Sequence, residues 1–296
     1  MRFLTLEDGQ LGVLIEERVV DLSAAAEALG APRPVLTLAE LVRNGDEMAM
    51  AAWELGLRAS DAGIATRPVE AVHPRAPIPQ PLRNIMCVGK NYREHAEEIA
   101  ATAIGGSGVP ERPIFFTKAT TAVIGSGDPI PNHSELTCKL DYEAEVAIVI
   151  GREARNLTRE SAMDHVFGYT AINDVTARDL QAAHVQWFLG KSLDGAAPMG
   201  PTLVHRSAMP EPEKIRVRCW VNGDLRQDGH LGQLIFDVST LLVTLSRGMT
   251  LLPGDIIATG TPKGVGAGFE PPRFLVPGDE VAIEVTGVGR LVNRVS

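Results

Sequence analysis

Hydrophobic and polar positions alternate with two different periods along the chain, and the change of period predicts two regions. Residues 2–21 alternate as short β-type runs around the turn signal Asp8-Gly9, and helical spacing follows at 23–29 and 38–57. Farther along the chain, β-type runs dominate and short helices interrupt them. The runs lie at 84–88, 145–150, 166–172, 215–221, 255–259 and 280–285, and the helices at 92–101, 174–183 and 236–247. This pattern predicts a β-rich α+β fold.

A segment rich in proline separates the two regions. Prolines stand at positions 68, 74, 77, 79 and 81. Proline fits neither a helix interior nor a central strand, so the segment is typical of a linker. We therefore expect a small N-terminal α/β domain over residues 1–72 and a catalytic domain over residues 73–296.

The composition excludes several classes of function. The net charge is −9 and no cluster of lysine and arginine stands out, which argues against nucleic-acid and membrane partners. Three widely spaced cysteines offer neither a thiolate zinc site nor a disulfide framework. The first ten residues lack the apolar run of a signal peptide, and no apolar run approaches 18 residues. We expect a cytoplasmic protein.

The segment DYEAEVAIVI places two or three carboxylates on one face of a buried strand. Side chains at i and i+2 share a face, so Glu143 and Glu145 project together with Asp141. Adjacent buried carboxylates are costly, and a hard divalent cation such as Mg²⁺ removes that cost. The alternative is a solvated strand end, or a pair of carboxylates neutralised by Lys139 and Arg152.

The segment GYTAINDVTARDLQ offers a further carboxylate. Asp174, Arg178 and Gln181 lie at i, i+4 and i+7, which predicts one helical face carrying a metal ligand, a guanidinium and an amide. The alternative is local: Asp174 or Thr176 caps the helix, and Asp174 pairs with Arg178.

The segment CVGKNYREHAEE places Tyr92, His95 and Glu98 along one helical stripe. His95 beside Glu98 has the form of a general base that a carboxylate orients. The stretch IGGSGVPERP that follows, residues 104–113, is typical of a mobile loop or lid.

For two other features we predict no chemical role. The string GVGAGF at 264–269 follows no βαβ pattern, so it does not indicate a dinucleotide site. Trp187 is most simply a packing residue.

Five ordered motifs resemble the fumarylacetoacetate hydrolase family, and the resemblance covers roughly residues 83–296. The motifs are GKNYREHAEE, DYEAEVAIVIG, GYTAINDVTARDLQ, WFLGKSLDGAAPMGP and GDIIATGTPKGVG. The resemblance implies a mixed β-sheet roll or sandwich, and a homodimer.

The resemblance also implies roles for single residues. The metal ligands would be Glu143, Glu145 and Asp174, the water-activating pair His95 and Glu98, the electrophilic helper Lys191, and the substrate contacts Arg178, Gln181 and Thr261. Mg²⁺ or Mn²⁺ would be the metal, with Ca²⁺ as a further candidate. We expect the three metal ligands to converge without compensating cations.

The predicted activity is hydrolysis of the carbon–carbon bond of a 2,4-dioxo acid, of the acylpyruvate or fumarylpyruvate type, through a metal-stabilised pyruvate enolate. Such a reaction belongs to the catabolism of aromatic compounds, with a small 2-oxo acid as the partner. The alternatives on the same site are oxaloacetate-type decarboxylation and isomerisation of a 2-hydroxydienoate, and the intact His95–Glu98 pair argues against a protein that only binds a dicarboxylate. Departures from the family pattern at Ala119, at 195–197 and at 230–233 leave the substrate open.

Overall fold

The N-terminal region combines a four-stranded antiparallel meander with two helices. The computed structural model describes residues 1–33, 36–100, 102 and 108–296. The elements of this region are β1 (Arg2–Thr5), β2 (Leu11–Ile15), β3 (Arg18–Asp21), α1 (Leu22–Ala28), α2 (Leu38–Asp61) and β4 (Thr66–Pro68). The predicted β-type runs and both helices are confirmed. Helix α2 is kinked at Gly45, whose φ of 77° is accessible to glycine at little cost.

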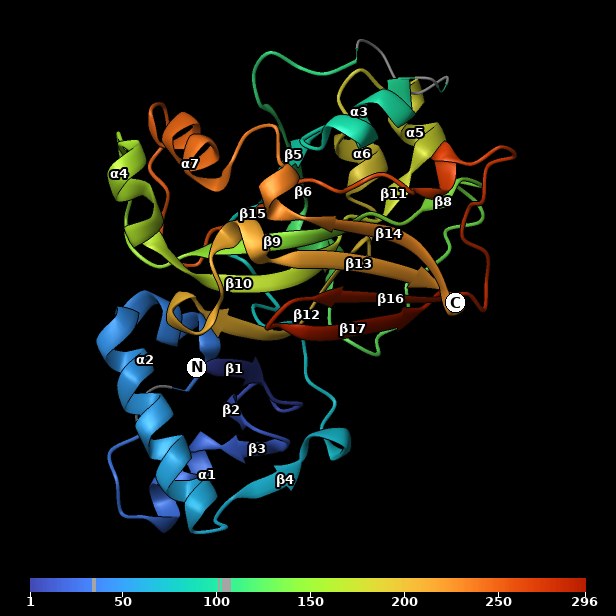
Figure 1. Ribbon diagram of the computed structural model, residues 1–296. Helices are drawn as coiled ribbons and strands as arrows, with labels where there is room; N and C mark the ends of the chain where they lie inside the picture. The colour runs from blue at the N-terminus through green and yellow to red at the C-terminus, as the bar shows by residue number, and fades with distance from the viewer. Residues whose placement is uncertain (34–35, 101, 103–107) are drawn as a thin grey trace.

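The N-terminal strands form one end of a large mixed sheet (Figure 1). Strand β1 pairs antiparallel with β12, so the sheet continues across the predicted domain boundary. The strand order is β4-β3-β2-β1-β12-β10-β9-β15-β5-β6, and β7 (Val123–Ile124) pairs with β12. The remaining strands are β5 (Ile85–Gly89), β6 (Ile114–Lys118), β9 (Ala144–Ile150), β10 (Val166–Asn173), β12 (Ala197–His205) and β15 (Ile256–Ala258). The boundary near residue 72 stays a prediction.

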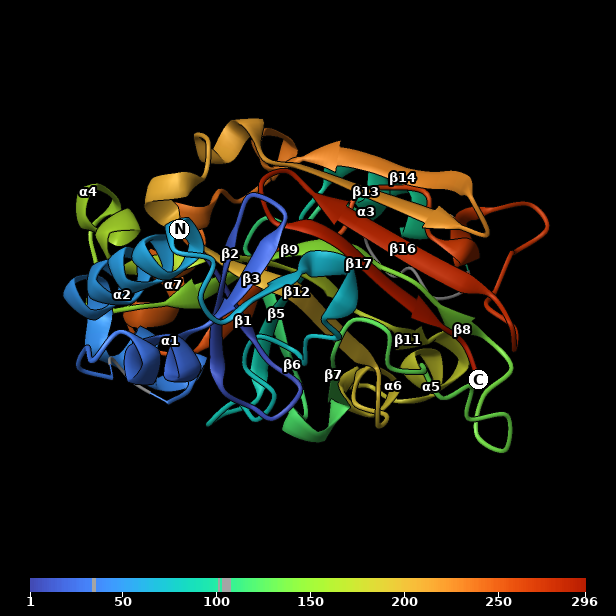
Figure 2. The same cartoon turned by 90° about the horizontal axis from the view of Figure 1, so that it is seen from below.

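A second, antiparallel sheet packs on the first. Its order is β14-β13-β16-β17 (Figure 2). Strand β13 contacts β9 of the large sheet, and β16 contacts β10. The bounds are β13 (Arg216–Val221), β14 (Asp224–His230), β16 (Glu280–Val285) and β17 (Gly289–Arg294). Every residue of β9 and β10 is buried, because these strands are covered on both faces. The packed sheets confirm the predicted α+β fold.

Short helices gather at one end of the large sheet, where β8 (Leu140–Asp141) pairs with β11 (Thr176–Ala177). They are α3 (Arg93–Ala100), α5 (Arg178–Ala183) and α6 (Phe188–Lys191), while α4 (Arg159–Ala162) and α7 (Val238–Ser246) lie at the opposite end (Figure 1). Helix α5 begins four residues later than predicted, because Thr176 and Ala177 are held in the β8–β11 pair. None of the described helices is both long enough and apolar enough to cross a membrane.

Candidate metal centre and active site

Three buried carboxylates converge where β9 begins and β10 ends. One oxygen from each of Glu143, Glu145 and Asp174 lies within 4.8 Å of the other two. The antiparallel register aligns Asn173 with Ala144, which brings the two chain ends side by side. The Asp174 N–H donates to the Glu143 carbonyl at 2.8 Å, and the Glu143 N–H donates to the Asn173 side chain at 3.0 Å. These hydrogen bonds fix the backbone that carries the cluster.

Two buried ammonium groups neutralise part of this charge. The Nζ of Lys191 lies 2.7 Å from both Glu143 and Asp174, and the Nζ of Lys118 lies 2.7 Å from the other oxygen of Asp174. The expectation that the carboxylates lack compensating cations is therefore wrong. Lys118 lies on β6 and Lys191 on α6. Both elements lie outside the sequence segments that carry the carboxylates, so the spacing within those segments did not reveal the cations.

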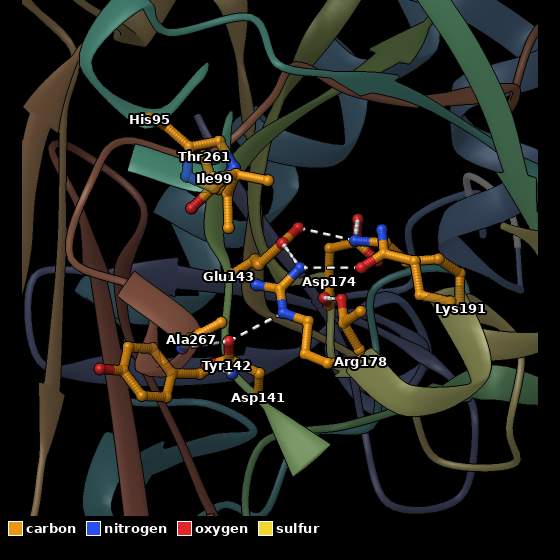
Figure 3. Close-up of polar contacts among 12 residues, drawn as sticks. His95, Ile99, Asp141, Tyr142, Glu143, Asp174, Arg178, Lys191, Thr261 and Ala267 are labelled. Atoms are coloured by element: carbon orange, nitrogen blue, oxygen red, sulfur yellow. Dashed lines mark hydrogen bonds and ion pairs between the residues drawn. The ribbon is translucent and has the colours of Figure 1, made fainter. Parts of the chain in front are cut away.

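The guanidinium of Arg178 is the third buried cation. Its Nε lies 2.8 Å from Asp141, and its Nη1 lies 2.7 Å from Glu143 and 3.2 Å from the amide oxygen of Gln181 (Figure 3). Among the described residues, its Nη2 has no hydrogen-bond partner and remains available to a ligand. The predicted Arg178–Gln181 face is confirmed. The predicted placement of Asp174 on that same helix is wrong, because Asp174 precedes β11.

Lys139 and Arg152, the cations considered from the sequence, do not take part in these ion pairs. Arg152 instead lies 2.7 Å from Asp46 of helix α2. Asp141 separates from the other carboxylates as well: it lies on β8, and the chain leaves the strand before Glu143. The three carboxylates therefore do not share one face of a continuous strand. Asp141 binds Arg178 from β8, whereas Glu143 and Glu145 belong to the cluster at the start of β9.

The charges leave one carboxylate unbalanced. Burial opposes the charged form of Glu143, but Lys191 and Arg178 outweigh it and hold the pKa of Glu143 well below its usual range. Burial would lower the pKa of Lys191, but Asp174 and Glu143 raise it. For Glu145, burial and the neighbouring charges of Asp174 and Glu143 all raise the pKa. Glu145 therefore carries the unfavourable charge of the cluster.

These residues fit a hard divalent cation. Carboxylate oxygens are the ligands that Mg²⁺ and Mn²⁺ prefer, and the three oxygens lie close enough to share one ion. A bound cation would also relieve the repulsion that raises the pKa of Glu145. The predicted ligand set of Glu143, Glu145 and Asp174 thus meets a test of distance and a test of charge.

Backbone N–H groups of the string GVGAGF donate hydrogen bonds to two carboxylates near the site. The Gly264 N–H donates to both oxygens of Glu98, at 3.0 and 3.2 Å. The N–H groups of Gly266 and Ala267 donate to Asp141 at 2.7 and 2.9 Å. An added Cβ at Gly266 would lie 2.3 Å from the Arg273 carbonyl oxygen and 2.7 Å from an Asp141 oxygen, so the close packing requires glycine. The loop therefore orients two protein carboxylates.

His95 and Glu98 lie on helix α3. The Nδ1 of His95 is 3.3 Å from Glu98, and His95 is 5% exposed. Because Glu98 is held by Gly264, it fixes the ring while the other ring nitrogen remains to act on a ligand. Of the lid predicted at 104–113, residues 104–107 lie outside the described residues.

A cavity joins these groups. Its volume is about 30 Å³, and its polar lining comes from His95, Glu143, Glu145, Arg178, Gln181, Lys191, Thr261 and Lys90. Figure 3 shows His95 and Thr261 on one side of Glu143, with Arg178 and Lys191 on the other. Thr261 also donates to the Ala144 carbonyl at 3.0 Å, which ties the loop after β15 to the acidic strand. Each predicted site residue therefore lines the cavity or contacts a residue that does; their individual roles stay predictions.

The sequence interpretation missed four groups of the site, of which Lys90 directly follows strand β5. Lys118 is fully buried at the end of the apolar strand β6, and a lysine in that place was a usable signal. Phe116 and Trp187 line the cavity, so describing Trp187 as a packing residue was incomplete. Alternation along β6 could have placed Phe116 and Lys118 on one face, but no local pattern places Trp187.

Comparison with known proteins agrees with this geometry. Residues 84–296 match the family model described as fumarylacetoacetate (FAA) hydrolase C-terminal. The chain belongs to the fumarylacetoacetate hydrolase family, whose enzymes generally bind a divalent metal.

Relatives in that family have several named activities. Oxaloacetate tautomerase YisK of Bacillus subtilis (strain 168) is 46% identical over 291 residues, covering 96% of this chain and 95% of that protein. The structure of a fumarylacetoacetate hydrolase from Exiguobacterium antarcticum is 41% identical, with a TM-score of 0.84 over 100% of this chain and 99% of that one. Maleylpyruvate hydrolase from Sphingobium sp. SYK-6, in complex with manganese(II) and pyruvate, is 31% identical, with a TM-score of 0.76 over 100% and 98%.

Proposed function

We propose that this enzyme interconverts the keto and enol forms of a four-carbon 2-oxo diacid of the oxaloacetate type. The observation that carries the proposal is the placement of His95, with its Glu98 partner, on the same cavity as the carboxylate cluster. A base beside a cation site is what proton removal next to a carbonyl requires. The whole-length similarity to an oxaloacetate tautomerase favours this reaction over others in the family.

The residues of the chain divide the proton transfer between them. His95 takes a proton from C3 of the keto acid, and the electron pair of that C–H bond becomes the C2=C3 double bond. The carbonyl oxygen takes up negative charge, which the ammonium of Lys191 can neutralise. Return of the proton to that oxygen gives the enol, so the reaction consumes no other reactant. Glu98 stabilises the imidazolium while the proton is held.

Glu143, Glu145 and Asp174 would hold the divalent cation. When bound, it supplies a Lewis acid that makes the C3 hydrogens of the 2-oxo acid more acidic. Arg178 contributes the Nη2 donor, and Gln181 lies beside it to orient a carboxylate.

Lys90 supports a diacid substrate. It lines the cavity directly after β5, and burial lowers the pKa of its ammonium. Its φ of 54° is unusual for a non-glycine residue. The buried side chain of Asn91 fixes the following backbone by donating to the Thr259 carbonyl at 2.8 Å and to the Phe236 carbonyl at 3.1 Å. Because a second carboxylate on the substrate would favour the charged form of Lys90, this wall is compatible with a diacid.

Hydrolysis of a 2,4-dioxo acid of the acylpyruvate or fumarylpyruvate type is the second candidate. The similarity to a maleylpyruvate hydrolase favours it. His95 would then deprotonate a water molecule that attacks the 4-carbonyl, and the cavity has room for such a water. Decarboxylation of oxaloacetate is the third outcome, and it needs no activated water.

One panel of assays separates the three reactions. Purified enzyme with Mg²⁺, with Mn²⁺ and with chelator is given oxaloacetate, acylpyruvates and a 2-hydroxydienedioate. Exchange of the C3 hydrogens with deuterium and loss of the enol absorbance report tautomerisation, while pyruvate formation reports cleavage or decarboxylation. We expect metal-dependent acceleration of keto–enol interconversion. Rapid pyruvate release from an acylpyruvate, without faster interconversion of oxaloacetate, would replace the proposal with hydrolysis.

A further inference from the structure

An aromatic pair forms an apolar wall of the cavity. The rings of Phe116 and Trp187 meet edge to face, with centroids 5.4 Å apart and an interplanar angle of 69°. The Nζ of Lys191 lies 5.0 Å from the centroid of the Phe116 ring. Phe116 therefore contacts, on one side, the ammonium that binds Glu143 and, on the other, the indole of Trp187.

Trp187 and Lys191 are carried by the same helical turn. Trp187 stands directly before α6, and its carbonyl accepts a hydrogen bond from the Lys191 N–H at 3.1 Å. Residues four apart on a helix share a face, which explains why both side chains reach the cavity. Trp187 is half-buried, and the residues before and after it, Gln186 and Phe188, are exposed. The indole thus stands between the cavity and the solvent.

Gly89 leaves the space in which the indole sits. An added Cβ at Gly89 would lie 2.5 Å and 3.0 Å from two carbons of the Trp187 ring, and 3.7 Å from Phe116. Gly89 ends β5 with extended pairing to Ile114, so the strand itself does not demand a glycine. The close approach of the indole is what demands it.

We propose that Trp187, seated against Gly89, is a specificity-determining residue that limits the length of the 2-oxo acid. The carboxylate cluster, Arg178 and Lys191 suit the carboxylate and carbonyl end of the ligand, which places its other end toward the aromatic wall and Lys90. The indole lines the cavity and fills the space over Gly89, so a longer acyl chain would meet the ring at this wall. The inference rests on the proposed function for the class of ligand, and it names what excludes longer members of that class.

The expected size of the effect follows from pocket energetics. One methylene that a pocket cannot accept changes selectivity by roughly 10- to 200-fold. Trp187→Leu keeps an apolar side chain but removes most of the ring volume. We therefore expect the ratio of kcat/KM for a longer acylpyruvate to that for oxaloacetate to rise by about tenfold or more.

The matched control is Trp220→Leu. Trp220 lies on β13 of the second sheet, where Arg218 and Arg290 lie over its ring, and it does not line the cavity. Each variant is measured for melting temperature and for kcat/KM with oxaloacetate and with acylpyruvates of increasing length. Calorimetry gives the affinities for oxalate, pyruvate, 2-oxobutyrate and 2-oxohexanoate in the presence of Mg²⁺. Only Trp187→Leu should gain affinity for the longer acids, with oxalate affinity unchanged within about twofold.

A double substitution tests the contact with Gly89. Gly89→Ala alone should displace the indole and alter the affinity profile across acid length. In the Trp187→Leu background the same change should have little effect, because the ring that it strikes is gone. Equal effects of Gly89→Ala in both backgrounds would overturn the role of this contact.

The outcomes separate this inference from the proposed reaction. If oxaloacetate is not tautomerised but Trp187→Leu still shifts affinity toward longer acids, the reaction is wrong and the length limit stands. If oxaloacetate is tautomerised but Trp187→Leu changes every ligand alike, or none, the length limit is wrong. The length limit would also be wrong if Trp220→Leu changed the dependence of affinity on acid length as much as Trp187→Leu does.

Discussion

The charge on Glu145 gives the sharpest test of the metal centre. Glu145 is 1% exposed, and its carboxylate accepts one hydrogen bond, from the Gly260 N–H at 2.8 Å. The ion pairs found among the described residues bind its neighbours Glu143 and Asp174 but not Glu145. Replacing it with glutamine keeps an oxygen for Gly260 and removes the charge. We predict that Glu145→Gln stabilises the metal-free protein and abolishes its stabilisation by metal.

The magnitude follows from the raised pKa. A carboxyl group whose pKa is higher in the folded state costs stability as the pH rises above its unfolded value. For Glu145 the penalty grows by about 1.4 kcal/mol per pH unit above the ordinary value of 4.5, until the folded pKa is reached. At pH 7 it is therefore at most about 3 kcal/mol, so Glu145→Gln should add up to about 3 kcal/mol to the free energy of unfolding of the metal-free protein. In a protein of this size, each kcal/mol raises Tm by roughly 2 °C.

Thermal unfolding of chelated and metal-loaded protein measures the effect. Wild type should gain Tm on addition of Mg²⁺ or Mn²⁺ by linkage, whereas Glu145→Gln should begin higher and gain little. The advantage of the chelated variant should shrink toward pH 5, where Glu145 of the wild type is protonated at less cost. Glu153→Gln, which changes an exposed carboxylate, is the control. A chelated Glu145→Gln protein that melts lower than wild type, or a full metal response, would refute the reasoning.

Three further substitutions test other parts of the structure. His95→Ala should lower the rate of tautomerisation or hydrolysis by roughly two to four orders of magnitude while Mg²⁺ binding by calorimetry persists; an equal loss of decarboxylation would show that His95 positions the substrate instead. Lys191→Met should lower kcat by more than it weakens oxalate binding, and should destabilise chelated protein by about 1–3 kcal/mol because Glu143 and Asp174 lose the cation that they share; unchanged kcat with weaker oxalate binding would contradict an electrophilic role. Arg206 chiefly holds the pKa of Asp46 below its usual range, so Asp46→Asn should cost about 1–3 kcal/mol at pH 7. That difference should begin to shrink as the pH falls below about 4, the ordinary pKa of the carboxyl, and should keep shrinking toward its depressed folded pKa; urea unfolding at pH 7 and pH 3 measures the first part of this decline.

The strands could be predicted because their signal is local. The apolar run after Glu145 becomes a strand buried on both faces, and the run ending at Asn173 becomes its antiparallel neighbour. The helix that carries His95 and Glu98 also follows directly from spacing. In these segments, propensity, periodicity and tertiary packing favour the same structure.

The remainder depended on pairing between distant segments. The expected helix at 174 starts at Arg178 because β11 pairs with β8, a contact that no short window contains. The same holds for Lys118, which reaches Asp174 from another strand. It also holds for Trp187, whose position depends on the absence of a side chain at Gly89. Sequence spacing showed which carboxylates gather, but not which cations balance them.

That balance would allow the proposed site to accept both a cation and an anionic substrate. Asp141, Glu143, Glu145 and Asp174 face Lys118, Lys191 and Arg178, so a single negative charge is in excess when all seven groups are ionised. If the site held carboxylates alone, its net charge would stay negative even with a divalent cation bound, and it would repel a dicarboxylate. If cations balanced the carboxylates evenly, the site would bind a divalent cation weakly. With one excess negative charge, a divalent cation turns the site to one positive charge, which attracts a carboxylate. In the proposed site, the buried lysines would therefore limit how negative the metal centre is toward the substrate.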